Sequence, residues 1–174
     1  YNELCYKYTK NPNKKFSLAL KLKKLNDAWE FAINEKNSEK CKMVADLALE
    51  LGEFNLAEKA MLEGNDFSGL LLYYSSIQNR DKLKQLSELA KSKGMFNVSF
   101  SCFYQLNELE ECVNLLIEAK RYPEAGLFCR TYLPSKLEEI IGKWNDALEK
   151  EDENRRVVVK ILNPISEEKR GVIL

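Results

Sequence analysis

Asn114–Pro134, with the sequence NLLIEAKRYPEAGLFCRTYLP, decides the fold of this chain. It leaves one segment with apolar residues at helical spacing, turns at Lys120–Pro123 and enters a second such segment. Pro123 suits the first turn of the second helix, where its missing N–H would have no partner. Pro134 ends that helix, because the residue before a proline disfavours helical geometry. The stretch predicts two helices folded back on each other.

Each of these helices carries one apolar stripe at positions i, i+3, i+4 and i+7, which is typical of an amphipathic helix. The first stripe consists of Leu109, Cys112, Val113 and Leu116, and the second of Ala125, Phe128, Cys129 and Tyr132. A single pair cannot cover both stripes, so neighbouring pairs are expected to complete the core.

The same pattern recurs from near the start of the chain to about residue 150. We expect helices to start near residues 25, 38, 54, 67, 80, 96, 108, 122 and 135, roughly every 14 residues, which makes a paired unit of about 27. Two turns, Leu51–Ala57 and Lys93–Ser99, resemble each other and place a glycine where a helix ends. The prediction is an all-α, TPR-like α-solenoid of about ten stacked antiparallel helices over residues 1–150. A closed bundle would favour fewer and longer helices.

Residues 151–174 differ in character from the rest. We expect a charged linker followed by a short apolar tail, since Val157–Leu162 has the sequence VVVKIL. This segment fits two roles: packing against the solenoid, or adding to an exposed edge of another subunit. The residues do not decide between them.

Composition excludes several classes of protein. The 27 basic and 27 acidic residues cancel, which argues against a nucleic-acid binder. There is no histidine, so histidine-based catalysis and histidine-containing zinc sites are ruled out. The five cysteines form no C-x-x-C pair, and we expect them to be reduced and structural in a cytosolic protein. The chain lacks an apolar run long enough for a membrane span, and its start at Tyr1 predicts a piece of a longer protein.

No residue set predicts catalysis. The acidic pairs Glu110–Glu111 and Glu138–Glu139 fall on expected outer faces near lysines, so we interpret them as solvated surface. Phosphate-binding glycine motifs do not occur. We therefore expect no enzyme activity, no catalytic, cofactor-binding or metal-binding residues, and no small-molecule substrate.

Aromatic residues gather on two helices and cover more than one face of each. On an ordinary amphipathic helix one apolar face would suffice, so part of this surface is a candidate for contact with another chain. The alternative is a two-sided solenoid core, in which each helix touches a neighbour on either side. The candidate partner-binding residues are Tyr73, Tyr74, Phe100, Phe103 and Tyr104.

Four stretches resemble the helical segment of the coatomer beta-prime subunits. Three are helical patterns: FSLAL at Phe16–Leu20, DFSGLLL at Asp66–Leu72 and NVSF at Asn97–Phe100. The fourth is more specific and combines LLI at Leu115–Ile117, RYPEA at Arg121–Ala125 and RTYLP at Arg130–Pro134. Ser68 stands where the family more often has a second glycine.

The resemblance implies a role as a structural scaffold in the COPI vesicle coat. Family members carry two WD-repeat propellers that bind dilysine signals on cargo, followed by a solenoid that assembles with the alpha subunit. GTP-loaded Arf brings the complex to Golgi membranes, for Golgi-to-ER and intra-Golgi transport. The expected location is cytoplasmic and peripheral on these membranes. The alternative is the solenoid of another propeller–solenoid adaptor, from intraflagellar transport or vacuolar tethering.

Overall fold

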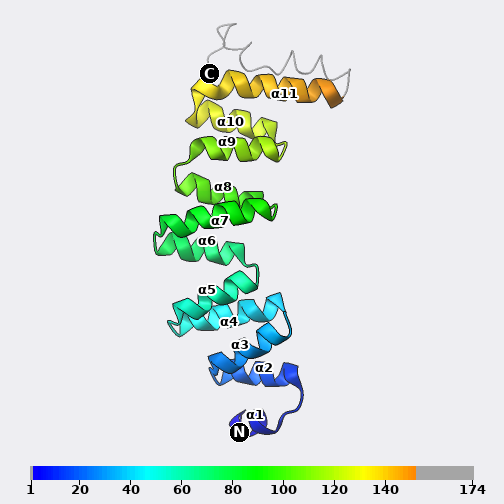
Figure 1. Cartoon of the computed structure of the whole chain (residues 1–174), viewed down its shortest axis with the longest axis vertical. Coiled ribbons are helices and arrows are strands. Elements are labelled where there is room, and N and C mark those ends of the chain that lie inside the picture. Colours follow the sequence, from blue (N-terminus) through cyan, green and yellow to red (C-terminus); the bar gives the residue numbers. More distant parts are fainter. Residues whose placement is uncertain (1, 152–174) are drawn as a thin grey trace. The chain divides into compact units, whose positions relative to one another are not determined.

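The computed structural model describes residues 2–151, and the expected tail after Glu151 lies outside them. The described part contains eleven α-helices, one 3-10 turn and no strand, which confirms the all-α, TPR-like fold (Figure 1). The helices are α1 Asn2–Tyr8, α2 Pro12–Lys21, α3 Leu25–Asn34, α4 Ser38–Glu50, α5 Phe54–Glu63, α6 Phe67–Ser76, α7 Arg80–Ser92, α8 Phe96–Gln105, α9 Leu109–Glu118, α10 Tyr122–Tyr132 and α11 Leu137–Glu151, with the 3-10 turn at Pro134–Lys136.

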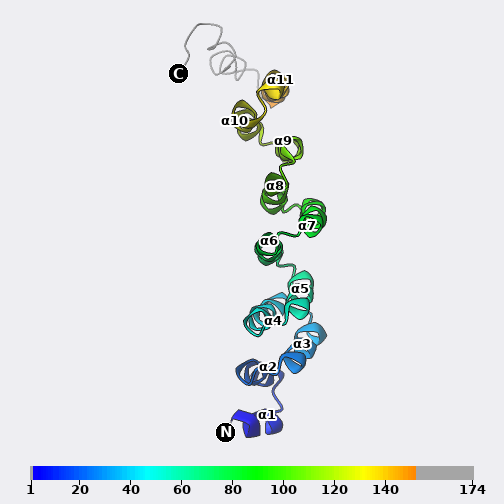
Figure 2. The ribbon, with the colours of Figure 1, turned by 90° about the vertical axis from the view of Figure 1, so that its left-hand side faces the viewer.

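The chain divides into two compact units, one ending at Leu86 and one starting at Ser87. In the first unit, consecutive helices run antiparallel, with α2, α4 and α6 in one layer and α3 and α5 in the other (Figure 2). In the second unit, α8 and α10 lie in one layer and α9 and α11 in the other (Figure 2). Small buried residues such as Ala19, Ala48 and Ala125 let the helices pack closely.

Eight successive turns, from the one after α2 to the one after α9, share one geometry. Each has a single residue with positive φ: Lys23, Lys36, Gly52, Asn65, Gln78, Gly94, Asn107 and Lys120. The N–H of the next residue bonds to a carbonyl five positions back, as in Met95 N to Ala90 O at 2.8 Å. This is the Schellman ending, in which left-handed backbone satisfies the last helical carbonyls. The carbonyl acceptors all belong to buried residues: Ala19, Ala32, Ala48, Met61, Tyr74, Ala90, Phe103 and Leu116.

The true repeat is three helices long, so the predicted pair of about 27 residues is wrong. Helices start at residues 38, 54, 67, 80, 96, 109 and 122, with spacings of 16, 13, 13, 16, 13 and 13. Every third spacing is longer because α4 and α7 have 13 residues, whereas α5, α6, α8 and α9 have 10. Three spacings add to 42, so Ser38, Phe54 and Phe67 correspond to Arg80, Phe96 and Leu109. The resemblance between Leu51–Ala57 and Lys93–Ser99 reflects this offset of 42 residues.

Several helix ends differ from the sequence expectation by one residue. Asn37, and not Ser38, caps α4, because its Oδ1 atom accepts from the N–H groups of Glu39 and Lys40. Ser38 instead donates to the carbonyl of Gly64, which joins α4 to the end of α5. Gly64 itself has an ordinary helical φ, and Asn65 takes the left-handed conformation.

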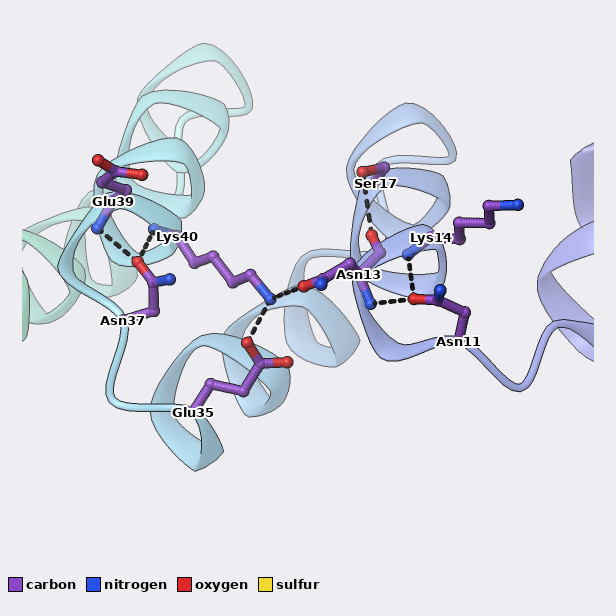
Figure 3. Close-up of polar contacts among 8 residues, drawn as sticks. All are labelled: Asn11, Asn13, Lys14, Ser17, Glu35, Asn37, Glu39 and Lys40. Carbon is purple, nitrogen blue, oxygen red and sulfur yellow. Dashed lines mark hydrogen bonds and ion pairs between the residues drawn. The ribbon is translucent and has the colours of Figure 1, made fainter.

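Lys40 links three helices of the first unit (Figure 3). Its ammonium group donates to Oδ1 of Asn13 at 2.6 Å, pairs with Glu35 at the end of α3 and lies 5.1 Å from the ring centre of Phe16. Its side chain is only 12% exposed, so these contacts replace most of its hydration. Caps at Asn11 and Asn37 hold the starts of α2 and α4 on either side of this contact (Figure 3).

Candidate interaction surface

Four aromatic rings from α8 and α10 form a continuous cluster in the second unit, which we call the aromatic cluster: Phe100, Tyr104, Phe128 and Tyr132. On each helix the two rings are four residues apart and therefore stand on one face. Phe100 and Tyr104 stack with ring centres 6.4 Å apart, and Phe128 and Tyr132 are 4.7 Å apart.

Edge-to-face contacts join the two helices. Phe100 meets Phe128 at 5.5 Å with planes 77° apart, and Tyr104 meets Tyr132 at 5.7 Å, also at 77°. Such geometry aligns positive ring edges with negative ring faces and adds to the gain from burial. The hydroxyl oxygens of Tyr104 and Tyr132 lie 3.1 Å apart, and this hydrogen bond raises the pKa of Tyr104 above its usual value. The cluster is thus held in one arrangement before any partner arrives.

The cluster is not fully covered by the chain. Tyr104 and Tyr132 are each 44% exposed, and Phe100 and Phe128 are half-buried. Leu127, next to Phe128 on α10, is 66% exposed. Together with Phe100, Phe128 and Tyr132 it lines an open groove with a volume of about 510 Å³.

One end of this groove is polar. The Arg121 guanidinium donates to Glu124 through Nε at 2.9 Å and to Oδ1 of Asn97 through NH1 at 2.9 Å. The hydrogen bond to Glu124 raises the pKa of Arg121. The groove therefore offers an apolar centre of aromatic and leucine side chains with a polar border, as protein interfaces commonly do.

The 42-residue repeat shows that the architecture does not require these apolar residues. Subtracting 42 from Phe100 gives Glu58, whose carboxylate is hydrogen-bonded to Tyr74 and Lys82. Subtracting 42 from Leu127 gives the polar Gln85. An apolar groove has thus replaced polar positions in the second copy of the repeat, which points to a requirement other than folding.

The structure separates the five predicted partner-binding residues. Phe103 is 1% exposed and packs against Cys112 and Leu115, and Tyr74 is also buried. These two belong to the two-sided core, so their proposed role in partner contact is wrong in the isolated chain. Phe100 and Tyr104 lie in the aromatic cluster. Tyr73 is half-buried in the first unit, where it stacks on the exposed Phe54 with ring centres 6.3 Å apart.

Sequence reasoning missed half of the aromatic cluster. Phe128 and Tyr132 fall on the apolar stripe of their helix and were therefore expected in the core, while Leu127 was not considered. A usable signal existed, because Phe128 and Tyr132 follow Phe100 and Tyr104 by 28 residues each and share their i, i+4 spacing.

The described residues contain no group of His, Cys, Asp and Glu that could hold a metal ion. Burial raises the pKa of the Cys102 and Cys112 thiols to about 11 and also raises that of Cys129 and Cys41, so these thiols stay protonated at neutral pH. None of the helices over residues 2–151 is both long and apolar enough to cross a membrane.

The fold and this surface define a helical-repeat segment built for contact with other proteins. The family model described as "COPA/B TPR domain" matches residues 1–145, and the chain belongs to this family. It is 41% identical over 140 residues to coatomer subunit beta'-1 of Arabidopsis thaliana and 44% identical over 138 residues to coatomer subunit beta'-2 of Oryza sativa subsp. japonica. With coatomer subunit beta' of Rattus norvegicus it shares 34% identity over 140 residues.

These alignments cover 79–80% of the chain and only 15–16% of each relative. The resemblance to the coatomer beta-prime subunits is confirmed.

Proposed function

We propose that this chain is a scaffold segment of a vesicle coat, and that the aromatic cluster of α8 and α10 is where it binds the alpha subunit of coatomer. The carrying observation is the apolar groove beside that cluster, at positions where the preceding repeat is polar. Family membership supports other coatomer subunits as partners.

The surface has the properties of an interface centre. Tyr104 and Tyr132 present rigid rings with few rotatable bonds, so burying them against a partner costs little side-chain entropy. Leu127 contributes an exposed aliphatic side chain whose burial favours association. Residues of this kind commonly dominate the binding free energy of an interface.

The wider role follows from the same assignment. Assembly with the alpha subunit would serve Golgi-to-ER and intra-Golgi transport, in the cytoplasm and on Golgi membranes to which Arf recruits the coat. The segment would contribute structure and no catalysis. Cargo recognition is not assigned to these residues. Membership of the coatomer family disfavours the intraflagellar and vacuolar-tethering alternative.

The test is to mix the chain with the solenoid of a coatomer alpha subunit and to measure mass by light scattering after gel filtration. We expect a one-to-one complex, which Leu127→Asp abolishes because a carboxylate would have to be buried in the interface. Leu127 is mostly exposed in the free chain, so its replacement should leave the melting temperature nearly unchanged.

Leu72→Asp is the matched control. Leu72 is 73% exposed on α6 in the first unit, and the same substitution there should leave the complex intact. Separate peaks for the two unmodified proteins would contradict the proposed partner. A complex that survives Leu127→Asp but not Leu72→Asp would place the interface on α6.

A further inference from the structure

A second groove lies in the second unit, where α11 approaches the turn between α9 and α10. It has a volume of about 580 Å³. One side is formed by Ile117, Tyr122 and Pro123 and the other by Trp144, Ala147 and Leu148 of α11, with charged side chains at the border.

This groove lies where the apolar stripe of α11 loses its cover. Ile140 and Ile141, near the start of α11, are each 2% exposed. Trp144 and Leu148, further along the same stripe, are only half-buried. Stacked-helix proteins cover the last apolar face of the array with a capping segment. Within residues 2–151, no helix follows α11 to do so.

The chain itself supplies an apolar segment at a suitable distance. Val157–Leu162 contains five apolar residues in six, four of them β-branched. Such a segment left in water favours aggregation, so its burial would benefit the chain. The family model ends at residue 145, so the tail lies outside the matched domain.

Length and charge both allow a return to the groove. Leu148 precedes the end of α11 by three residues, or about 4.5 Å along the helix. The five residues from 152 to 156 can span roughly 17 Å when extended. Asp146 at the groove can meet the tail's Arg155 and Arg156, and Lys120 can meet Asp152 and Glu153.

We propose that Val157–Leu162 folds back onto this groove, covers Trp144 and Leu148, and caps the end of the helical array. The contact is intramolecular and does not depend on the coat function. It selects the first of the two roles that the sequence left open for the tail.

The experiment uses the full chain with Trp29→Phe, so that Trp144 is the sole tryptophan. In the double variant Val158→Asp/Ile161→Asp, quenching of Trp144 by acrylamide should rise about twofold and its emission should shift to longer wavelength, because water reaches the exposed indole. Ile165→Asp/Val172→Asp is the matched control, with the same charge outside the segment, and should change neither signal.

A second measurement does not rely on Trp29→Phe. In the chain with both tryptophans, amide hydrogen exchange over Trp144–Leu148 should be faster in the Val158→Asp/Ile161→Asp variant than in its control. Equal exchange and equal quenching in all chains would overturn the proposal. A dimer that dissociates in the same variant would also overturn it, because the segment would then dock on a second copy.

Discussion

The ammonium group of Lys82 on α7 lies 2.7 Å from Oε1 of Glu58 on α5, 24 residues earlier in the chain. The hydroxyl of Tyr74 on α6 donates to the same oxygen, also at 2.7 Å. One carboxylate therefore joins three consecutive helical layers of the first unit. Burial alone would raise the pKa of Glu58, but the hydrogen bonds from Lys82 and Tyr74 outweigh it and lower that pKa below its ordinary value.

Glu58→Gln should destabilise the chain at neutral pH by about 1 kcal/mol, since it removes a charge-assisted pair whose lysine is partly exposed. Because the folded-state pKa of Glu58 is lowered, its contribution is complete above the unfolded-state value near 4.5 and is lost as pH falls through the folded-state value. The difference in unfolding free energy between the two chains should therefore shrink below about pH 4.5, as measured by urea titration at several pH values.

Glu139→Gln is the control for this prediction. The pKa of Glu139 is also lowered, chiefly by a hydrogen bond from Lys143, but this pair lies on the surface of α11. Its removal should change the free energy of unfolding much less than Glu58→Gln does. An equal effect would mean that the Glu58 contact contributes no more than an ordinary surface ion pair.

Ser99→Ala should leave the chain as stable or stabilise it by up to about 1 kcal/mol, because a buried hydroxyl without a hydrogen bond is unfavourable. The Ser99 hydroxyl is fully buried on α8 and has no hydrogen-bond partner among the described residues. Ser87 is equally buried but does have an interaction partner, so Ser87→Ala should cost stability. Thermal unfolding of the two variants distinguishes them, and a loss in Ser99→Ala as large as in Ser87→Ala would contradict the assignment.

The helices were predictable because their signals are local. Apolar stripes of period 3.6 and glycines at 52 and 94 located nearly every helix from α3 onward. The three-helix repeat was missed because six of the eight left-handed turn residues are not glycine. Lys23, Lys36, Gln78 and Lys120 give no sequence signal of positive φ. An average spacing of about 14 residues also hid the alternation of 16 and 13.

The aromatic cluster was only half predictable for a different reason. The spacing shows that Phe100 and Tyr104 share a face, and likewise Phe128 and Tyr132, but not that the two faces meet across the layer. That contact depends on α8 and α10 lying side by side, which is a tertiary fact. For the same reason the sequence could not show that Phe103 is buried while Tyr104 is exposed.

The cysteines should differ sharply in reactivity. Four of the five are buried and only Cys5 is half-buried. At pH 8 a disulfide reagent should label one thiol quickly in the native chain and all five in denaturant, because access and thiolate fraction both limit the reaction. The expected reduced state would be contradicted if fewer than five thiols reacted in denaturant.

Two glycines in equally open surroundings should respond to alanine in opposite ways. An added Cβ would meet no atom within 4 Å at either Gly94 or Gly142. Gly94 has a φ of +73° in the turn after α7, so Gly94→Ala should destabilise the chain by about 1 kcal/mol through left-handed backbone strain. Gly142 lies inside α11, where alanine has the higher helix propensity, so Gly142→Ala should stabilise by about 0.5–1 kcal/mol. Urea titration followed by circular dichroism measures both, and a shift of the same sign in the two variants would show that backbone conformation does not set their stability.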